Sequence, residues 1–581
     1  MTNFLDKKAI SRMYAAVIAI IIIVAAIIGA AYYVTLPGPS PSPSSSATPS
    51  PSSTSSPSAS SNVTGTRLAR RGESFPCYID PAVGADFCSQ DGQTNLYDPL
   101  VWPQPGGGVL PWIATNWTIS DDALNYTFTI RQGVQFHDGG TLTANDVAFS
   151  MQRLLTVGQG YSWIYTDYIN NQTGMTVIDP YTIMFHINKP EGAFLSSLVR
   201  LYIVEKATVL AHNTTGPYGS FGDYGTTWLA TNDAGSGPYK LKAISVDSYV
   251  DMTQFANYWN SGAVNSLAPT EVDLVATAAS SATEKTSMLN KQLEVSDEWQ
   301  GDSFLDPLNT TGYITIQSHA DDGEYYYMFN CQLKPTDDVY VRQALAYCFD
   351  YPTVSAEIYS RFASSGSCIP MALPGAVNVT PYYYNTTLAL EMLKQSKYYP
   401  DIINHPDNYP IAFQVMNEVP ERMSDALHLA ETAAIIGLTV HVTSVPWGTM
   451  VGEVGNVSTT PNILPIVIDP LYADAGSMLA ERYSLASQGS FDNTNWLNNA
   501  TLDAEIATAQ GTMDTTSRNA QYAHIQQEVM KICPDIYVYD FKVVEAVQNY
   551  CWIPQMHNSS SVTGIQGYND DFKTWQISPS T

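Results

Sequence analysis

The stretch of sequence that decides the fold is TFTIRQGVQFHDGGTLTANDVAFSMQRL, which runs from Thr127 to Leu154. Apolar side chains alternate with polar ones from Tyr126 to Ile130, and this period of two predicts a half-buried strand. The chain turns at Gly133, and Val134 and Phe136 predict a second short strand. The stretch therefore begins with two short strands joined by a turn.

A glycine-rich turn and a helix complete the stretch. The residues from 138 to 140, Asp-Gly-Gly, supply positive φ angles that are inexpensive only for glycine. Thr143 has the features of an N-cap, and Asp146 three residues later gives a capping-box arrangement. Apolar residues then recur at helical spacing from 147 to 155, which predicts a helix.

The neighbouring His137 and Asp138 allow two interpretations. They are either a general acid/base pair of an enzyme or structural residues between a strand and a helix. A catalytic pair needs a nucleophile or a third group nearby, and the surrounding sequence offers neither. We therefore expect Asp138 to stiffen the turn and His137 to pack beside it.

Length and composition limit the class of protein. The chain has 581 residues, more than one hydrophobic core usually serves, so two or three lobes are expected. The formal net charge of −28 argues against nucleic acid or an anionic membrane surface as a partner, because both require faces rich in Lys and Arg. Only 14% of the residues are charged, and uncharged polar groups supply the remaining solubility, which suits an extracellular surface.

A long apolar segment lies near the N-terminus. Residues 13–66 include no charged residue, and residues 13–34 are apolar enough to cross a ~30 Å hydrocarbon layer as a helix. Three cationic residues precede this segment and place the N-terminus in the cytoplasm. A cleaved secretory peptide is the weaker interpretation, because the apolar run is too long and lacks a small-residue cleavage site. We expect residues 1–36 to form a signal or transmembrane anchor.

Two features flank this anchor. The sequence KAIS, residues 8–11, resembles the processing site of archaeal pilin-like signal peptides, and cleavage after Ala9 would leave the apolar helix in place. Residues 37–66 are rich in Ser, Pro and Thr, cannot bury a core, and predict a disordered stalk. Asn-x-Ser/Thr sequons recur through the rest of the chain, as in a glycosylated exterior protein.

The seven cysteines include no CxxC pair, which argues against a thiolate zinc site. In an oxidising compartment three short spacings would each allow a loop-closing disulfide, namely Cys77/Cys88, Cys348/Cys368 and Cys533/Cys551. The odd number leaves at least one cysteine unpaired.

Several segments resemble one known family, in the order in which that family has them. The opening stretch contains R-x-G-V-x-F-H-D-G and L-T-A-x-D-V, which are similar to the signature of the family 5 extracellular solute-binding proteins, the oligopeptide, dipeptide and nickel receptors of ABC importers. The other segments are YIDPA (78–82), NLYDPLV (95–101), LPWIATNW (110–117), GSGPYKL (235–241), MFNCQLKPTDDVYVRQALAYCFD (328–350) and NTNWLNNATLDAEIATA (493–509). The resemblance covers the chain from about residue 75 to the C-terminus.

The resemblance implies an α/β fold of the periplasmic-binding-protein type, in its large, peptide-binding class, with two lobes and mixed sheets. The first lobe would be discontinuous: residues 67–335 would form its first part, and residues 537–581 would form its returning segment. The second lobe would span residues 336–536, and Pro335 to Asp338 would be the crossover. The lobes would close over a ligand by a hinge motion.

The resemblance also implies where a ligand binds. Tyr97 occupies the position of a cleft-lining tyrosine, and IDPLYADAGSML (468–479) corresponds to a segment whose first aspartate holds the α-ammonium of a bound peptide. Aligning Tyr472 and Asp474 with that segment leaves the anchor position without an aspartate, because Asp469 lies two residues early. Asp469 either still reaches the ammonium or marks a turn after a strand. Loss of the anchor would favour an uncharged ligand such as an oligosaccharide.

Two tryptophans complete the candidate residues. Trp299 lies in a polar loop, and we expect it to face the cleft. Trp447 matches a family tryptophan that helps to seat a helix, so we expect it to pack rather than to bind.

We therefore expect an extracellular receptor of an ABC importer, tethered to the cell membrane by a single N-terminal pass. It would capture peptides or oligosaccharides between its lobes and deliver them to permease subunits with their ATPases, without a catalytic residue, a metal or a cofactor. One alternative is an extracellular hydrolase, although no G-x-S-x-G, H-E-x-x-H or P-loop motif occurs. The other is a structural surface-layer component.

Overall fold

The computed structural model describes residues 66–73, 77–277, 281–379, 382–419, 421–558 and 563–578. These residues belong to one unit that spans Gly65–Thr581. The expected anchor, the processing site after Ala9 and the stalk up to residue 65 lie outside the described residues. Within the described ranges, no helix is both long and apolar enough to cross a membrane.

The stretch from Thr127 to Leu154 begins with one strand rather than two. β5 (Asn125–Ile130) buries alternate side chains on one face, as its period of two predicts. The prediction of a second short strand is wrong, because the chain after the Gln-Gly turn forms only a single bridge between Gln135 and Thr141. The tight glycine turn between these two residues reverses the chain before a longer ladder can form.

The helix predicted after that turn is confirmed. α3 (Ala144–Val157) begins with the capping box, in which the carboxylate of Asp146 accepts a hydrogen bond from the backbone N–H of Thr143 at 2.9 Å. It ends at Gly158, whose φ of 69° is the left-handed conformation that glycine adopts most readily at a helix C-terminus.

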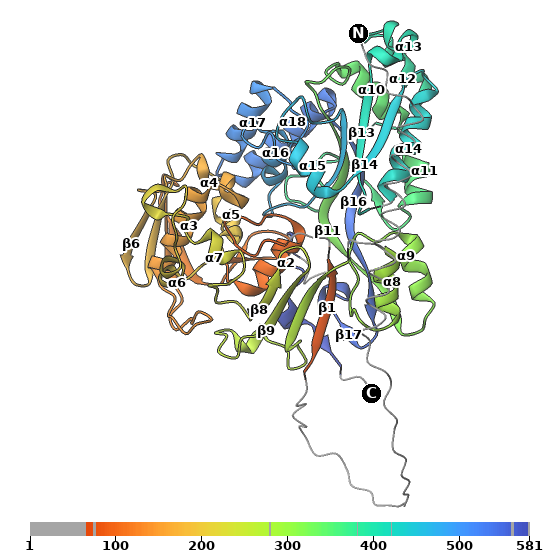
Figure 1. The fold of residues 1–581 in the computed structure, drawn as a ribbon. Helices are drawn as coiled ribbons and strands as arrows, with labels where there is room; N and C mark the ends of the chain where they lie inside the picture. Colours follow the sequence, from red (N-terminus) through yellow and green to blue (C-terminus); the bar gives the residue numbers. More distant parts are fainter. Residues whose placement is uncertain are drawn as a thin grey trace, which may run out of the picture. The chain divides into compact units, whose positions relative to one another are not determined.

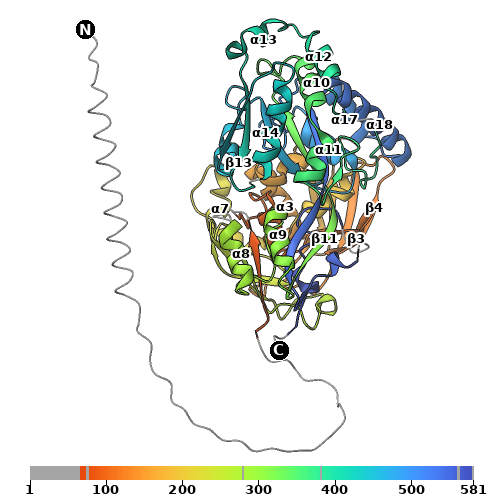
Figure 2. The same ribbon diagram turned by 90° about the vertical axis from the view of Figure 1, so that its right-hand side faces the viewer.

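The largest sheet is mixed and has six strands in the order β12-β16-β11-β15-β13-β14. The strands are β11 (Ile314–Phe329), β12 (Ala363–Ser364), β13 (Ile411–Met416), β14 (Val440–Val445), β15 (Ile463–Ile468) and β16 (Asp535–Gln548). β11 is antiparallel to both of its neighbours, whereas β13 is parallel to both of its neighbours. In Figures 1 and 2, β11 and β16 run side by side through the middle of the described unit.

Helices cover both faces of this sheet, which explains the run of large residues in β11 (Figure 1). Tyr325, Tyr327 and Phe329 point into one core, whereas Tyr326 and Met328 point into another. The first core contains residues of α10 (Val339–Cys348), α12 (Thr386–Leu393) and α14 (Glu421–Ala434). The second contains residues of α16 (Ala475–Tyr483), α17 (Ala500–Gln510) and α18 (Thr515–Ile532).

Four smaller sheets complete the strands. One four-stranded sheet has the order β1-β10-β9-β8. In it, β1 (Leu68–Glu73) is parallel to β10 (Glu271–Ala276), and β9 (Tyr249–Gln254) and β8 (Tyr239–Ser245) are the next strands across the sheet. In the order β4-β5-β7-β6, β5 is joined by β4 (Ala114–Ile119), β7 (Thr182–His186) and β6 (Met175–Asp179). The two-stranded sheets pair β2 (Val101–Pro103) with β3 (Val109–Pro111), and β17 (Cys551–Trp552) with β18 (Gln576–Ile577).

The remaining α-helices are short. They are α2 (Phe87–Leu96), α4 (Trp163–Thr166), α5 (Phe194–Ser197), α6 (Lys206–Ala211), α7 (Thr226–Leu229), α8 (Ser281–Leu289), α9 (Asp302–Asn309), α11 (Tyr351–Thr353), α13 (Asp401–Asn404) and α15 (Trp447–Glu453). The first turn of α2 and Trp447 of α15 contribute to the pocket described below.

The mixed α/β fold agrees with the prediction, and the segment expected to return as a strand forms β16 and β17. The lobe boundaries at 335/336 and 536/537 stay a prediction. β16 runs across the second of them.

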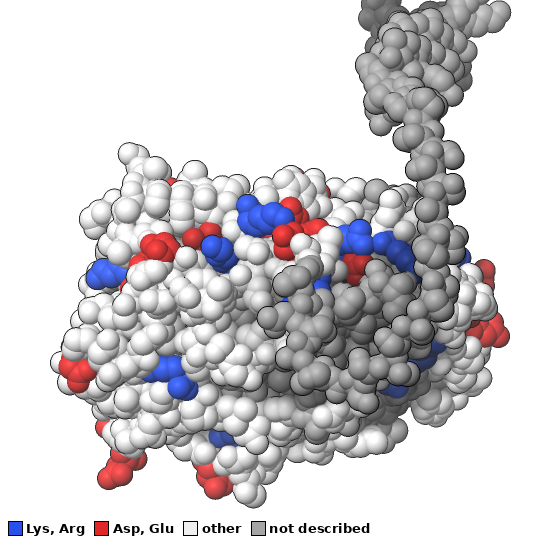
Figure 3. All heavy atoms as spheres, turned by 90° about the horizontal axis from the view of Figure 1, so that it is seen from below, with Lys and Arg blue, Asp and Glu red and all other residues white. Residues whose placement is uncertain are grey.

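Charged side chains are sparse on the surface, as the low content of charged residues in the sequence predicts. On the face drawn in Figure 3, charged side chains are few, and acidic and basic ones lie intermixed among neutral residues.

All seven cysteines are free thiols, and the three loop-closing disulfides are not formed. The Sγ of Cys77 instead donates a hydrogen bond to the carbonyl oxygen of Cys88 at 3.1 Å.

Candidate functional site

A cavity of about 100 Å³ lies at the carboxyl ends of three neighbouring strands. Because β13 is parallel to both β14 and β15, the ends of these strands meet at one edge of the sheet, which is where open α/β sheets bind ligands. Met416 ends β13, Ile468 ends β15, and Trp447 follows β14 after one proline. All three line the cavity, and the first turn of α2 and Gln566 contribute the facing wall.

Asp469 follows β15 directly and lines the cavity with 2% of its surface exposed. The backbone after it is fixed from two sides, because Leu471 N donates to Ser477 Oγ at 3.0 Å and Arg200 Nε donates to Leu471 O at 2.8 Å. Gly323 of β11 lies so close that an added Cβ would overlap with Oδ1 of Asp469. The position of this carboxylate is therefore set by its surroundings.

Aromatic side chains form two groups on the walls. Trp299 packs edge-on against Phe87, with ring centroids 4.9 Å apart, and stacks on Phe541 at 5.2 Å. Trp447 packs edge-on against Phe491 at 5.4 Å. Apolar walls with a few polar groups are typical of a small-molecule binding site.

The cavity is acidic. Six carboxylates line it, from Glu73, Asp86, Glu418, Asp469, Glu481 and Asp492. Among the described lining residues, Arg422 in the first turn of α14 is the single cation. Its guanidinium lies 5.0 Å from the ring centroid of Tyr325, and Nη1 donates to Met416 Sδ at 3.0 Å. This excess of negative charge favours a ligand with cationic groups.

Three of the six carboxylates have partners that explain their presence. Glu73 accepts a hydrogen bond from Arg71 Nε at 2.7 Å, and Asp86 is the N-cap of α2. Glu418 accepts one from the backbone N–H of Trp447 at 3.1 Å.

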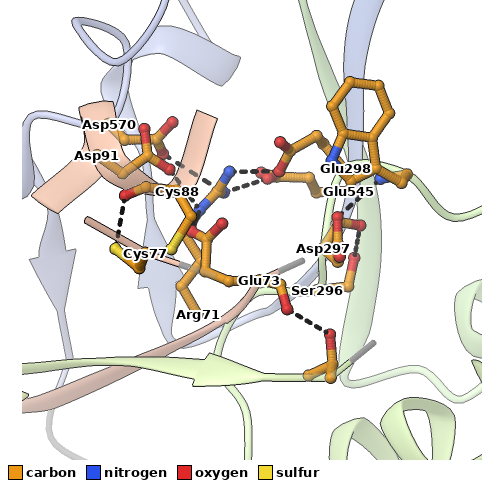
Figure 4. Close-up of polar contacts among 12 residues, drawn as sticks. Arg71, Glu73, Cys77, Cys88, Asp91, Ser296, Asp297, Glu298, Glu545 and Asp570 are labelled. Carbon is orange, nitrogen blue, oxygen red and sulfur yellow. Dashed lines mark hydrogen bonds and ion pairs between the residues drawn. The ribbon is translucent and has the colours of Figure 1, made fainter. Parts of the chain in front are cut away.

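Glu73 also belongs to a buried group that we call the Arg71 cluster (Figure 4). Its five carboxylates, which surround one guanidinium, are those of Glu73, Asp91, Glu298, Glu545 and Asp570. They come from β1, α2, the segment before α9, β16 and the C-terminal segment, so the cluster joins distant parts of the chain.

Burial disfavours the ionised form of most carboxylates in the Arg71 cluster. Burial raises the pKa of Glu73, Asp91 and Glu298 well above the ordinary value and that of Glu545 to about 7, although the charge of Arg71 opposes the shift. One guanidinium cannot balance five ionised carboxylates in a buried site.

The structure brings two of the five predicted ligand-binding residues together. Trp299 and Asp469 line the same cavity. Tyr97 and Tyr472 are buried in the hydrophobic core, and Asp474 is the N-cap of α16. The carboxylate of Asp474 also pairs with Nε of an arginine of α18 at 3.2 Å. Direct contact of any of the five with a ligand stays a prediction.

His137 and Asp138 do not form a pair. His137 Nδ1 lies 2.5 Å from Asp233 Oδ1, and its Nε2 lies 3.1 Å from the carbonyl oxygen of Gly237. Asp138 accepts a hydrogen bond from the backbone N–H of Gly140 at 2.8 Å, which closes the turn. Both ring nitrogens of His137 are therefore occupied by structural contacts.

Among the charged lining residues, sequence reasoning missed Glu418, Arg422, Glu481 and Asp492. Arg422 and Glu418 follow the end of β13, so a search for polar residues after each predicted strand would have found them. Glu481 lies inside a helix and Asp492 in an irregular loop, where no pattern marks them. Within the part of the chain that the structure describes, no group of three or more His, Cys, Asp or Glu is placed to hold a metal ion.

Comparison with known proteins identifies relatives of similar length. A glutathione-binding protein of Salmonella typhi is 23% identical over 478 residues, which cover 81% of this chain and 88% of that protein. A dipeptide-binding protein of Escherichia coli is 26% identical over 356 residues, which cover 58% of this chain and 64% of that protein. Both are binding proteins rather than enzymes by name.

Solved structures share the fold. An ABC transporter-associated periplasmic binding protein from Helicobacter pylori, in complex with the peptide STSA, has a TM-score of 0.74 at 20% identity, covering 88% of this chain and 98% of that one. The murein tripeptide-binding protein of Escherichia coli has a TM-score of 0.71 at 20% identity, covering 90% and 100%. The family model of the bacterial extracellular solute-binding proteins, family 5 Middle, matches residues 108–490. The chain belongs to the extracellular solute-binding proteins of family 5.

Proposed function

We propose that this protein is the peptide-binding receptor of an ABC importer, and that the cavity beside Asp469 holds the ligand. The observation that carries the proposal is the acidic, aromatic-walled cavity at the carboxyl ends of β13, β14 and β15. The names of the relatives, which bind glutathione and dipeptides, support a peptide ligand.

The charges of the walls suit the two ends of a peptide. The α-ammonium group would face Asp469, and the carboxylate would face Arg422, the cation among the described lining residues. Charge-assisted hydrogen bonds of this kind contribute about 1.5–3 kcal/mol each. An uncharged oligosaccharide would stack on Trp299 and Trp447 but would bring no cationic group to this acidic cavity, so we favour the peptide.

Calorimetric titration of the purified full-length chain with short peptides and with oligosaccharides tests the proposal. We expect reversible binding of peptides without turnover and loss of about 10- to 100-fold in affinity in Asp469→Asn, because the amide cannot balance the ammonium charge. Sugar binding that is indifferent to Asp469→Asn would exclude the ammonium anchor. Release of amino acids from a peptide would instead favour a hydrolase.

We also propose how the receptor is attached to the cell. The apolar segment at residues 13–34 would tether the receptor to an archaeal cell membrane, with processing after Ala9, and the glycosylated stalk would hold the binding domain outside the cell near its permease and ATPases. Mass spectrometry of the mature N-terminus and of glycopeptides tests this, because an N-terminus beyond residue 34 would exclude the tether.

A further inference from the structure

Two carboxylates of the cavity have no evident structural task. Glu481 lies in the last turn of α16, and Asp492 lies in the loop that follows this helix. Glu481 is 3% exposed and lines the cavity, yet its Oε2 accepts no hydrogen bond from any described residue. A buried acceptor without a donor is unfavourable by about 1–3 kcal/mol, so a ligand group that donates a hydrogen bond to this oxygen would be favoured.

The arginines that influence Glu481 are engaged elsewhere. Arg200 Nε donates to the backbone oxygen of Leu471, and its Nη1 donates to side-chain and backbone oxygens on the facing wall. Arg482 forms its ion pairs with Glu324 and with an aspartate of β16. Neither guanidinium forms an ion pair with Glu481 among the described residues, although Arg200 Nη2 and Arg482 Nε have no hydrogen-bond acceptor there.

The two carboxylates also influence each other. Burial raises the pKa of Asp492 to about 7. Burial, followed by the charge of Asp492, raises the pKa of Glu481 well above its usual range, while Arg200 and Arg482 oppose this shift. Both shifts favour the protonated form, and an entering cation would favour ionisation and the release of a proton.

We propose that Glu481 and Asp492 form a second cation subsite of the binding cavity, which receives an alkylammonium or guanidinium group of the ligand. The proposal rests on the proposed function and extends it: the preferred peptide carries a basic side chain in addition to its α-ammonium group.

The charge balance of the cavity fits such a ligand. The carboxylates of Asp469, Glu481 and Asp492 line the cavity together with one cation among the described lining residues, Arg422. A peptide with two cationic groups and one carboxylate complements this set, whereas a free diamine leaves Arg422 without an anion. Because Asp469 follows β15 and the pair lies on α16 and its loop, the two acidic positions come from different segments of the wall.

Titration of the full-length chain with two matched dipeptides tests the subsite. Alanyl-lysine and alanyl-norleucine differ in the terminal ammonium group, so their affinity ratio isolates that group. We expect the lysyl peptide to bind at least about 10-fold more tightly, and Glu481→Gln or the less buried Asp492→Asn to abolish the preference while retaining norleucyl binding. The control is Glu528→Gln on α18, which changes the net charge equally on a side chain that is 34% exposed.

A second readout concerns protons. Titration at pH 7 in buffers of different ionisation enthalpy should show release of about one proton with the lysyl peptide and less with the norleucyl peptide. Binding of 1,4-diaminobutane as tightly as the lysyl peptide, with the same loss in Glu481→Gln, would assign the subsite to free amines and would overturn the basic-peptide ligand.

The outcomes separate the two proposals. Equal affinity for both dipeptides in the wild-type chain overturns the cation subsite and leaves the peptide receptor intact. Absence of binding by both peptides, in a chain that unfolds cooperatively, overturns the receptor proposal itself.

Discussion

The Arg71 cluster and the Glu481–Asp492 pair are both buried groups of carboxylates, and they differ in what balances them. In the Arg71 cluster, bonds from one guanidinium reach five carboxylates on five segments of the chain (Figure 4). In the pair, no cation of the described residues forms an ion pair with either carboxylate, whereas Glu545 of the cluster, which also has one oxygen without a donor, is paired with Arg71. The difference indicates that the Arg71 cluster stabilises the fold, which we call the frame, and that the Glu481–Asp492 pair serves ligand binding. Mutations should therefore separate stability from affinity.

The largest effect is expected from Arg71→Met. Removal of the guanidinium leaves buried carboxylates without a counter-charge, which should lower the free energy of unfolding by about 3–5 kcal/mol at pH 7. The loss should be smaller at pH 5, because protonated carboxylates need no cation. Urea unfolding at both pH values measures this.

Arg70→Met is the matched control on the same strand. Arg70 pairs with one carboxylate, that of Glu294, at 2.8 Å, and is itself 28% exposed although Glu294 is 3% exposed, so the change should cost less than Arg71→Met. Equal losses for the two substitutions would show that the Arg71 cluster does not maintain the frame.

The wild-type protein should be more stable in mild acid. Burial raises the pKa of Glu545, Asp425 and Asp492 to about 7 and that of Glu284 to about 9. A carboxylate whose pKa is raised on folding binds more protons in the folded state, so its stability contribution is present at low pH and is lost as pH rises through the folded pKa. Thermal unfolding between pH 5 and 9 should give a falling melting temperature.

Carboxylates with a lowered pKa do not reverse the fall in melting temperature between pH 5 and 9. Hydrogen bonds from the backbone and side chain of Thr214 and from Thr227 help to lower the pKa of Asp223, although burial opposes them. The contribution of Asp223 is therefore lost only in stronger acid. A melting temperature that rises steadily from pH 5 to 9 would contradict the proton-holding role of the buried acids.

Gly323→Ala should reduce affinity without altering any charge. The added Cβ would overlap with Oδ1 of Asp469 and displace that carboxylate, so we expect peptide affinity to fall about 10-fold or more. Gly448→Ala in α15 is the control, because a Cβ there meets nothing within 4 Å. Unchanged peptide affinity in folded Gly323→Ala would remove Asp469 from the ligand site.

The fold was predictable where a local pattern and its tertiary setting agree. The alternation in β5, the capping box of α3 and the continuous apolar strand before Asp469 are all present in the structure. The short strand expected near Gln135 failed because a ladder depends on the available partner residues, and a tight turn left only one bridge. The strand propensity of a segment does not show whether partner residues for a ladder are available.

The site was less predictable, because it is assembled from segments far apart in the chain. Asp469 could be placed near a cavity by resemblance, and Trp299 by its position in a polar loop. Glu481 is separated from Phe87 on the facing wall by almost 400 residues, and only the folded sheet brings them to one cavity. The hydrogen-bond deficit of Glu481 is a property of three-dimensional packing, so no sequence pattern contains it.

The smallest effect is expected from Thr143→Ala. The substitution removes one half of the capping box of α3 and should lower the free energy of unfolding by about 1 kcal/mol. Peptide affinity should be unchanged, because α3 belongs to the frame: Arg153 on this helix binds Asp80 through two hydrogen bonds of 2.6 Å. Urea unfolding and calorimetric titration of the same preparation give both values.

Thr156→Ala is the control for this change. Thr156 lies in the last turn of α3, and its Oγ1 donates to the backbone oxygen of Gln152 at 2.7 Å, a bond within the helix that caps no free N–H group. Its loss should alter stability by less than about 0.5 kcal/mol. A fall in peptide affinity in Thr143→Ala, with the protein fully folded, would couple the frame to the ligand site and break the separation on which the comparison of the two acidic groups depends.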